Sequence, residues 1–296
     1  MSRWLVAGSG GMLGQDLVAT LTAEGGDVTG LTRRDLDITD GAAVRAAVRA
    51  ARPDVVVNCA AWTAVDDAEA HEDEAYQVNA TGAAHLAAAC AAGHGDARTR
   101  LVQISTDYVF AGDARTPYAE HDPVAPRTAY GRSKLAGEQA VLRLLPGAGY
   151  VVRTAWLYGA HGSNFVATMI RLERERPTVD VVDDQHGQPT WTADVARQVI
   201  ALVRSGGAVG TYHATSSGEG TWYDLAREVF TLLGADPDRV RAASSSTYVR
   251  PAPRPAYSVL GHDGWARAGL AAIGDWRLAL RRAFPALTAR QAEERR

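Results

Sequence analysis

Near its start the chain reads Trp4-Leu5-Val6-Ala7-Gly8-Ser9-Gly10-Gly11-Met12-Leu13-Gly14, which is an apolar run, a glycine-rich turn and the first residues of a helical pattern. Residues without a Cβ let the backbone approach a pyrophosphate, and the N-terminus of the following helix favours negative charge. The spacing G-x-x-G-x-x-G also ends on a glycine that would let this helix pack closely on the strand. Many glycine-rich turns are only tight connections, but at a first strand–helix junction the pattern predicts a dinucleotide site. Its candidate residues are Gly8, Gly10, Gly11, Met12, Leu13 and Gly14.

The patterns that follow alternate between strands and helices. Apolar runs of strand length at 4–7, 28–31, 54–59, 101–104 and 150–154 are separated by helical patterns at 12–23, 41–51, 72–92 and 129–145. This alternation predicts an α/β fold with a Rossmann-type, doubly wound parallel sheet that has helices on both faces.

The alternation loosens after about residue 160, with helical patterns at 164–174, 192–203 and 221–233 and strand patterns at 179–182 and 212–214. We therefore expect a smaller, mixed α/β C-terminal part that binds substrate. The expected boundaries are a dinucleotide-binding domain at 1–160, completed by segments within 179–215, and a mainly substrate-binding, interleaved domain at 161–296. Alternate prolines at 251, 253 and 255 exclude helix and predict an extended surface segment. The charged tail from Ala289 is expected to fray.

The composition excludes several classes of protein. With 296 residues, 46% hydrophobic and 22% charged, the chain has the composition of a globular protein, and its net charge of −3 gives no general attraction to nucleic acid or anionic membrane. No apolar run approaches the length of a membrane-spanning helix or a signal peptide. Cys59 and Cys90 fall in apolar patterns without the spacing of disulfide or metal sites. We expect a cytoplasmic protein that binds neither nucleic acid nor membrane.

The residues after the second strand bear on the type of dinucleotide. Thr32-Arg33-Arg34 follows the strand, with no acidic residue at the position that usually holds an adenosine ribose. Arg33 or Arg34 could instead contact a 2′-phosphate, which favours NADPH, with NADH possible as a second cofactor. The alternative is that both are solvated loop arginines in an arginine-rich protein.

Two further segments complete the expected cofactor site. Asp37 and Ile38 could flank an adenine, the carboxylate accepting a bond from its amino group and the isoleucine packing on the ring. The third strand ends in Ala60 and Ala61, whose small side chains leave room for the middle of the cofactor.

The segment Tyr130-Gly131-Arg132-Ser133-Lys134 places a phenol and an ammonium on one face of a helix. A nearby cation lowers the pKa of a phenol and makes it a better general acid, and the lysine could also bond the nicotinamide ribose. Lys134 is the only lysine among 31 basic residues. Codon bias explains the arginines, whereas a site that needs a compact ammonium explains this lysine. Thr106 ends a strand, where its hydroxyl could bond a substrate carbonyl, so Thr106, Tyr130 and Lys134 are the candidate catalytic residues.

With these residues the chain resembles the extended short-chain dehydrogenase/reductases that act on nucleotide sugars, and among them the dTDP-4-dehydrorhamnose reductases. The resemblance runs from residue 3 to about 285, and its later motifs are far more specific than the glycine turn. They are NCAAWTAVD at 58–66, STDYVF at 105–110, RTAWLYG at 153–159, DQHGQPT at 184–190, GTYH at 210–213 with WYD at 222–224, and RPAYS at 254–258.

The resemblance implies a reaction and a set of site residues. A hydride from NADPH or NADH would go to C4 of a dTDP-4-keto-6-deoxy-L-hexose, giving dTDP-L-rhamnose, while Tyr130 protonates the new alkoxide. Lys134 would hold the cofactor ribose and Thr106 would polarise the carbonyl. The sugar pocket would be lined by Thr63, Val65, Asp107, Tyr108 and Trp156 together with Thr106 and Tyr130, and Thr63 would also contact the cofactor. Trp156 could equally be a core residue, and Asp107 a turn or helix cap.

The sequence departs from the family in more than one place, and one of these departures concerns a metal. Some members dimerise through magnesium held by acidic residues, and Asp16 could match one such ligand, but Thr192 stands where a second acid is expected. We therefore expect no metal, and a monomer or a weak homodimer.

Rival interpretations remain. A nucleotide-sugar dehydratase or epimerase is disfavoured because Asp107 is followed by Tyr108 and not by the glutamate base of dehydratases. A reductase of another dTDP-4-keto deoxysugar, such as a dihydrostreptose-type synthase, has the same crevice and catalytic residues, so the sequence does not separate it. A non-catalytic NADP-binding subunit, like that of methionine adenosyltransferase, is the third possibility, and the presence of Thr106, Tyr130 and Lys134 favours an enzyme instead.

Overall fold

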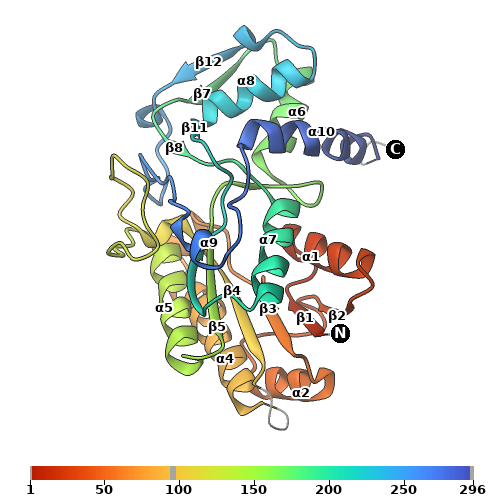
Figure 1. Ribbon diagram of the computed structural model, residues 1–296. Helices are drawn as coiled ribbons and strands as arrows, with labels where there is room; N and C mark the ends of the chain where they lie inside the picture. The colour runs from red at the N-terminus through yellow and green to blue at the C-terminus, as the bar shows by residue number, and fades with distance from the viewer. Residues whose placement is uncertain (1, 94–97, 294–296) are drawn as a thin grey trace.

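A parallel sheet of six strands forms the centre of the computed structural model, which describes residues 2–93 and 98–293 (Figure 1). The strands lie in the order β2-β1-β3-β4-β5-β10, and each neighbouring pair is parallel. Because the strand order reverses between β1 and β3, the carboxyl ends of these strands form a crevice suited to a ligand. The predicted doubly wound fold is confirmed. The strands are β1 (Arg3–Ala7), β2 (Asp27–Leu31), β3 (Val55–Asn58), β4 (Arg100–Thr106), β5 (Gly149–Thr154) and β10 (Gly210–His213).

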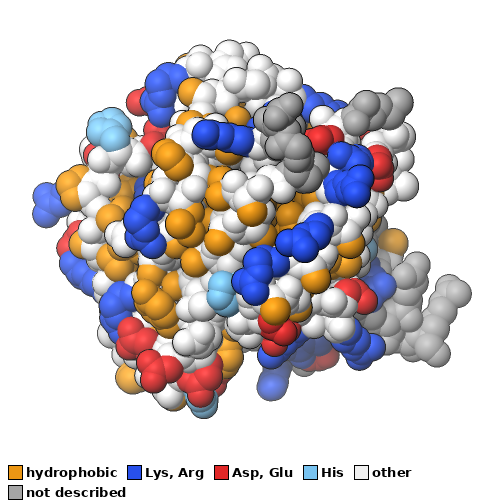
Figure 2. All heavy atoms as spheres, turned by 90° about the horizontal axis from the view of Figure 1, so that it is seen from below, with side chains coloured by type: hydrophobic (Ala, Val, Ile, Leu, Met, Phe, Trp, Pro, Cys, Tyr) orange, Lys and Arg blue, Asp and Glu red, His pale blue; other side chains and the backbone are white. Residues whose placement is uncertain are grey.

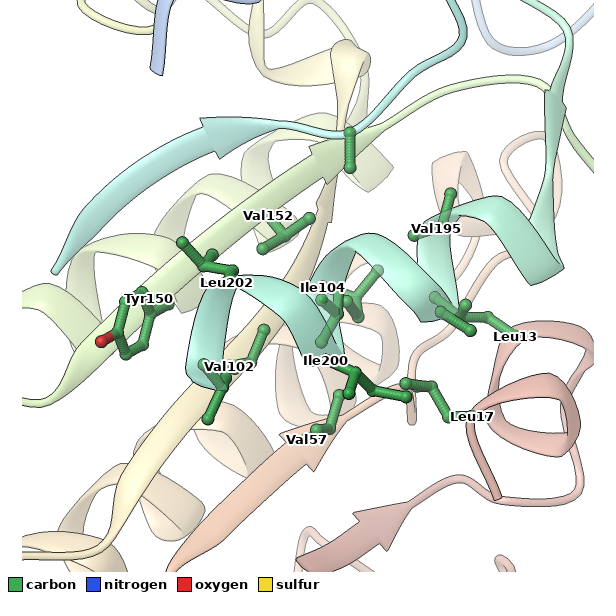
Figure 3. Packing of buried hydrophobic residues seen from close by; sticks show 14 of the residues in the cluster. Leu13, Leu17, Val57, Val102, Ile104, Tyr150, Val152, Val195, Ile200 and Leu202 are labelled. Atoms are coloured by element: carbon green, nitrogen blue, oxygen red, sulfur yellow. The ribbon is translucent and has the colours of Figure 1, made fainter. Parts of the chain in front are cut away.

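Helices cover both faces of the sheet because alternate strand side chains point to opposite sides. Trp4 and Val6 enter a core with α1 (Met12–Ala23) and α7 (Thr192–Ser205), which Figure 3 shows from close by. Leu5 enters a second core on the other face. The helices that form this second core are α2 (Gly41–Ala51), α4 (Gly82–Ala92) and α5 (Ala129–Leu144).

The single long helix predicted at 72–92 is interrupted in the structure. It consists of α3 (Glu72–Tyr76), a π-helical turn at Gln77–Thr81 and α4. The turn carries Asn79, whose side chain accepts a hydrogen bond from the Trp62 amide at 2.9 Å and donates to the Ser133 hydroxyl at 2.9 Å. Apolar periodicity alone does not reveal one extra residue in a turn, so the sequence could not show this interruption.

The C-terminal part forms a smaller lobe above the carboxyl edge of the sheet (Figure 1). Its core contains Ile170, Phe230 and Trp276, and β7 and β12 pair in a small parallel sheet. Thr221 and Asp224 form a capping box at the start of α8. The elements of this lobe are α6 (Phe165–Glu175), β7 (Val179–Val182), α8 (Trp222–Leu232), β12 (Val240–Ala243) and α10 (Trp276–Glu293).

The remaining elements are short. They are the paired strands β6 (Leu157–Tyr158) and β9 (Thr190–Trp191), the paired strands β8 (His186–Gly187) and β11 (Gly220–Thr221), the helix α9 (Asp263–Arg267), and the 3₁₀ turns Asp67–Glu69, Asp107–Val109, Pro237–Arg239 and Ser245–Thr247.

Helix α10 is the largest element that the sequence patterns miss. Pro285 lies inside it, and the expectation that the tail frays from Ala289 is wrong as far as Glu293. The last three residues lie outside the described part of the chain. Burial of Trp276 and Leu280 in the lobe's core outweighs the hydrogen bond that proline removes from the helix.

Within residues 2–93 and 98–293, no helix is long and apolar enough to cross a bilayer. On the face seen from below, apolar side chains and arginines are interspersed (Figure 2).

Gly137 on α5 lies directly against the Asn79 carbonyl of the π turn, so a Cβ there would overlap backbone. We expect Gly137→Ala to lower the free energy of unfolding by about 2 kcal/mol or more, although alanine is the better helix former. Denaturant unfolding followed by circular dichroism measures this. Gly274→Ala is the control, because no atom lies within 4 Å of a Cβ built there. Equal stability of the two variants would contradict the close contact.

Candidate active site

A cleft of about 830 Å³ lies between the carboxyl edge of the sheet and the C-terminal lobe. The glycine turn and the ends of β3, β4 and β5 form its floor, and residues of α6, β7 and α8 line it from the other lobe. The cleft lies at the edge where a doubly wound sheet binds its ligands.

The glycine turn has the shape of a phosphate cradle. Gly8 has φ +76°, and a Cβ at this position would lie 2.5 Å from the Ala60 amide nitrogen. A Cβ on Gly14 would overlap the Gly8 carbonyl, so α1 approaches the strand as the spacing predicts. Gly11 precedes the first turn of α1 without a capping side chain, so the first N–H groups of the helix are left open, and the residues of this turn line the cleft. The residues present therefore fit a pyrophosphate at the end of α1.

The residues expected at the adenine end are more dispersed. Arg33 is exposed. The pKa of Asp37 is lowered by hydrogen bonds from the amide and hydroxyl of Thr39, at 2.9 and 2.8 Å, and to a smaller extent by the charge of Arg33. The Ile38 side chain is only 4% exposed and packs against Gly82 in the core. It offers little surface to a ring, so the expected packing of this side chain on an adenine has no support in the structure.

The three candidate catalytic residues converge on the cleft. The Thr106 hydroxyl accepts a hydrogen bond from the Tyr108 amide at 3.2 Å and donates to Asp107 Oδ1 at 2.9 Å. Tyr130 lies in the first turn of α5, and a hydrogen bond with the Thr106 side chain lowers the pKa of its phenol. Lys134 lies one helical turn later, and its Nζ donates to the Ile104 carbonyl at 2.6 Å.

The local sequence explains why α5 begins here. The Thr128 hydroxyl caps the helix by accepting a hydrogen bond from the Gly131 amide at 3.0 Å. A Cβ on Gly131 would overlap the Tyr108 carbonyl, so glycine allows α5 to start directly against the segment that follows β4.

Burial dominates the electrostatics of these residues. It raises the pKa of the Tyr130 phenol, the nearby Asp107 raises it further, and only the hydrogen bond with Thr106 opposes the shift. The structure therefore does not reproduce the expected lowering of this pKa by Lys134, whose ammonium is directed to Ile104. Burial also lowers the pKa of Lys134 to about 8, although the charge of Glu138 opposes it.

The residues expected in the sugar pocket lie beside this group. Thr63, Val65, Asp107, Tyr108 and Trp156 all line the cleft. Tyr108 packs edge to face on Tyr130, with ring centroids 5.6 Å apart, and Val65 contacts the same cluster. Asp107 is buried, and burial raises its pKa to about 6 against the opposing hydrogen bonds from Ser258 and Thr106.

Trp156 has an unusual backbone that its neighbours hold in place. Its φ of +47° is in the left-handed region, which side chains of this size rarely adopt. Its indole stacks on Trp222 at 3.6 Å and lies against Gly187, where any Cβ would overlap the ring.

The sequence patterns missed several residues of the cleft. Trp222 belongs to the motif WYD at 222–224, to which no role was assigned. Arg254 falls in a motif to which no role was assigned, and it donates to Asp66 at 2.8 Å, with Arg250 at 3.7 Å from the same carboxylate. The Ser105 hydroxyl lines the cleft and is buried without a hydrogen-bond partner among the described residues, so it is available to a bound ligand.

Asp16 and Thr192 are the two positions considered for magnesium. Asp16 and Thr192 both lie beside Gly159, and the Thr192 hydroxyl donates to the Tyr158 carbonyl at 3.1 Å. In the described part of the chain, no group of three or more histidine, cysteine, aspartate or glutamate residues could hold a metal ion.

A doubly wound sheet with a glycine turn and a threonine, tyrosine and lysine at its carboxyl edge defines an extended short-chain dehydrogenase/reductase. More particularly, the chain belongs to the RmlD family, the family of the dTDP-4-dehydrorhamnose reductases: the family described as RmlD substrate binding domain matches residues 2–289.

Known relatives support this assignment along nearly the whole chain. A dTDP-4-dehydrorhamnose reductase of Streptomyces griseus is 57% identical, over 97% of this chain and 95% of the relative. A dTDP-4-keto-6-deoxy-D-glucose reductase of Streptomyces niveus is 58% identical, over 97% and 98%. The structure of a dTDP-4-dehydrorhamnose reductase of Bacillus anthracis in complex with NADP matches with a TM-score of 0.89 and 38% identity, over 96% of this chain and 99% of the other.

Asp107 yields a prediction on stability. Because its pKa is raised to about 6 in the folded protein, its favourable contribution is complete below about pH 4 and is lost as the pH rises through 6. At pH 7.5 the ionised carboxylate costs about 3 kcal/mol of stability. We expect Asp107→Asn to raise Tm by several degrees at pH 7.5 and by about half as much at pH 5.

Differential scanning calorimetry at both pH values checks this prediction. Asp27→Asn, at an exposed position on β2, is the matched control and should change Tm equally little at either pH. An Asp107→Asn protein that is destabilised at pH 7.5 would contradict the cost assigned to the buried charge.

Proposed function

We propose that the protein reduces the C4 ketone of dTDP-4-dehydro-6-deoxy-L-mannose to dTDP-L-rhamnose, with NADPH as the preferred reductant. The observation that carries this proposal is the convergence of Thr106, Tyr130 and Lys134 in one cleft beside the glycine turn. The names of the relatives and the NADP bound to the Bacillus anthracis enzyme support it.

The cofactor would lie along the floor of the cleft. Its pyrophosphate fits the open N-terminus of α1, and the exposed Arg33 could reach a 2′-phosphate. Bound NADPH supplies the hydride that reduces the ketone carbon. Lys134 would hold the nicotinamide ribose, for which its ammonium must leave or share the Ile104 carbonyl.

The chain's own residues handle the proton. Because burial raises its pKa, Tyr130 stays protonated at neutral pH and has a proton to give to the new alkoxide. The Thr106 hydroxyl hydrogen-bonds the same phenol and can also bond the substrate carbonyl. It would therefore hold the carbonyl oxygen within reach of Tyr130. Lys134 would stabilise the phenolate that remains.

The side chains beside the catalytic group suit a deoxysugar joined to a nucleotide. Val65 and the stacked Trp156 offer apolar surface to a methyl group, and Asp107 and Thr63 can bond hydroxyls. Arg250 and Arg254 also line the cleft and would attract the diphosphate.

A second substrate is favoured by one observation. The Streptomyces niveus relative is named for a ketosugar of the D-glucose series, and it is as similar to this chain as the rhamnose enzyme is. The same catalytic group could reduce either sugar, because the ketone lies at C4 in both.

The assay that tests the proposal follows the loss of reduced-nicotinamide absorbance with each of the two dTDP-ketosugars. We expect the highest kcat/KM with the L-rhamnose precursor and NADPH, and a lower value with NADH. If only the D-glucose compound is reduced, it is the substrate in place of the L-rhamnose precursor. If neither sugar is reduced, the proposed reductase activity is wrong.

Removal of the phenol hydroxyl tests the role of the general acid. We expect Tyr130→Phe to lower kcat by about 10²–10⁴-fold, because that is the usual contribution of such a group. The affinity for NADPH, measured by fluorescence titration, should stay within about twofold of the wild-type value. Tyr76→Phe, at an exposed position on α3, is the control. Wild-type turnover by Tyr130→Phe would refute Tyr130 as the acid.

A further inference from the structure

Behind the catalytic group lies a buried ion pair to which the proposed reaction assigns no role. Glu138 lies one helical turn after Lys134 on α5, and its side chain is 2% exposed. Arg153 of β5 donates two hydrogen bonds to this carboxylate, at 2.9 and 2.8 Å, and its side chain is 6% exposed.

Stability alone does not account for this pair. Removing two charges from water is costly, and well-packed apolar residues in place of a buried ion pair are often at least as stabilising. The pair is nevertheless held from several sides. The Arg153 guanidinium lies 4.9 Å from the Phe110 ring centroid and donates to the Glu120 carbonyl at 3.3 Å.

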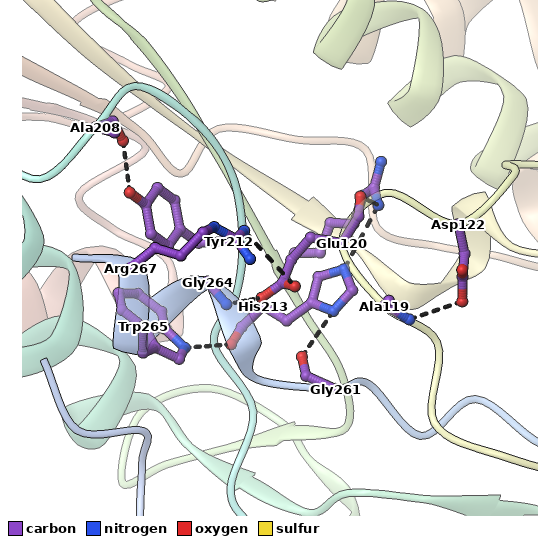
Figure 4. Close-up of polar contacts among 11 residues, drawn as sticks. Ala119, Glu120, Asp122, Ala208, Tyr212, His213, Gly261, Gly264, Trp265 and Arg267 are labelled. Carbon is purple, nitrogen blue, oxygen red and sulfur yellow. Dashed lines mark hydrogen bonds and ion pairs between the residues drawn. The ribbon is translucent and has the colours of Figure 1, made fainter. Parts of the chain in front are cut away.

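The groups around Arg153 add little competing charge. His213 Nε2 lies 3.5 Å from Arg153, but burial and the arginine lower the pKa of His213 to about 3, so the ring is neutral. Its other nitrogen bonds the Gly261 carbonyl at 3.0 Å (Figure 4). Glu120 is directed to the Gly264 amide, at 2.7 Å. Glu138 is therefore the carboxylate that pairs with Arg153.

Lys134 lies in a site that disfavours its charge. The titratable side chains that share the cleft with it are Cys59, Asp107, Tyr108, Tyr130, Asp180, Tyr248, Arg250 and Arg254. Burial raises the pKa of Cys59 to about 12 and that of the Tyr130 phenol as well, so both are neutral at physiological pH. Glu138 is the group that most strongly opposes the effect of burial on the pKa of Lys134.

We propose that Glu138, fixed by its two hydrogen bonds to Arg153, is a positioning residue that keeps Lys134 charged beneath the cofactor site. Glu138 reaches neither substrate nor cofactor and acts through the lysine alone. The inference rests on the role proposed for Lys134, but it concerns the charge of this side chain and can be tested without substrate.

The sequence itself provides a direct probe. Because Lys134 is the only lysine, protein labelled with ε-¹³C-lysine contains one labelled amine, and its NMR shift follows one titration. The wild-type midpoint should lie close to the pKa of about 8. We expect Glu138→Gln to lower this midpoint by about one pH unit, because a nearby opposite charge shifts a pKa by that amount or more.

Three further variants separate charge from structure. Glu120→Gln, in the same network but bonded to Gly264, should leave the midpoint unchanged. Glu138→Asp keeps the charge, and the midpoint of Lys134 in this variant should lie close to the wild-type value. If Glu138→Gln does not fold because Arg153 is left unpaired, the double variant E138Q/R153M removes both charges and should show the lowered midpoint.

Turnover gives an independent readout. A shift of one unit predicts that kcat/KM of Glu138→Gln falls about fivefold at pH 8 relative to wild type, with little change at pH 6.5. A wild-type midpoint in Glu138→Gln, or equal midpoints in Glu138→Asp and Glu138→Gln, would overturn the inference. If the midpoint falls in Glu138→Gln as expected but the wild-type protein reduces no ketosugar, the proposed function is overturned and the inference about Glu138 stands.

Discussion

The contact between the Gly8 turn and the end of β3 is the constraint on which the rest of the structure depends. A Cβ at Gly8 would lie 2.5 Å from the Ala60 amide, so the turn can lie against the segment after β3 only with glycine there. This close contact lets α1 bring Leu13 and Leu17 into the core and leaves the first N–H groups of the helix open to the crevice. One backbone contact thus sets both the packing of this face and the place of a phosphate.

The chemistry of the cleft depends on burial as much as on the residue types. Burial shifts the pKa values of Tyr130, Lys134 and Asp107 in the direction that favours the neutral form of each side chain. Such a site keeps a proton on the phenol but works against the lysine's charge. An ionised carboxylate behind the lysine resolves this conflict, and the arginine that fixes it comes from the neighbouring strand.

Much of this arrangement could be predicted from the sequence, because it follows from local patterns and topology. Thr106 ends a strand and Tyr130 begins the next long helix, so a parallel sheet places them at one edge. The π turn at Asn79, helix α10 around Pro285 and the stacking of Trp222 on Trp156 could not be predicted, since each depends on packing between distant segments. The burial of Ile38 could not be predicted either, because it depends on the segments that pack around this side chain.

The burial of Lys134 also determines how the protein meets acylating reagents. The chain has no other lysine, and this one is 4% exposed at the floor of the cleft. The outer surface therefore offers no ε-amine to an activated ester or an aldehyde, and its positive charge is carried by guanidinium groups, which such reagents leave intact. Covalent attachment through lysine would have to pass through the active site.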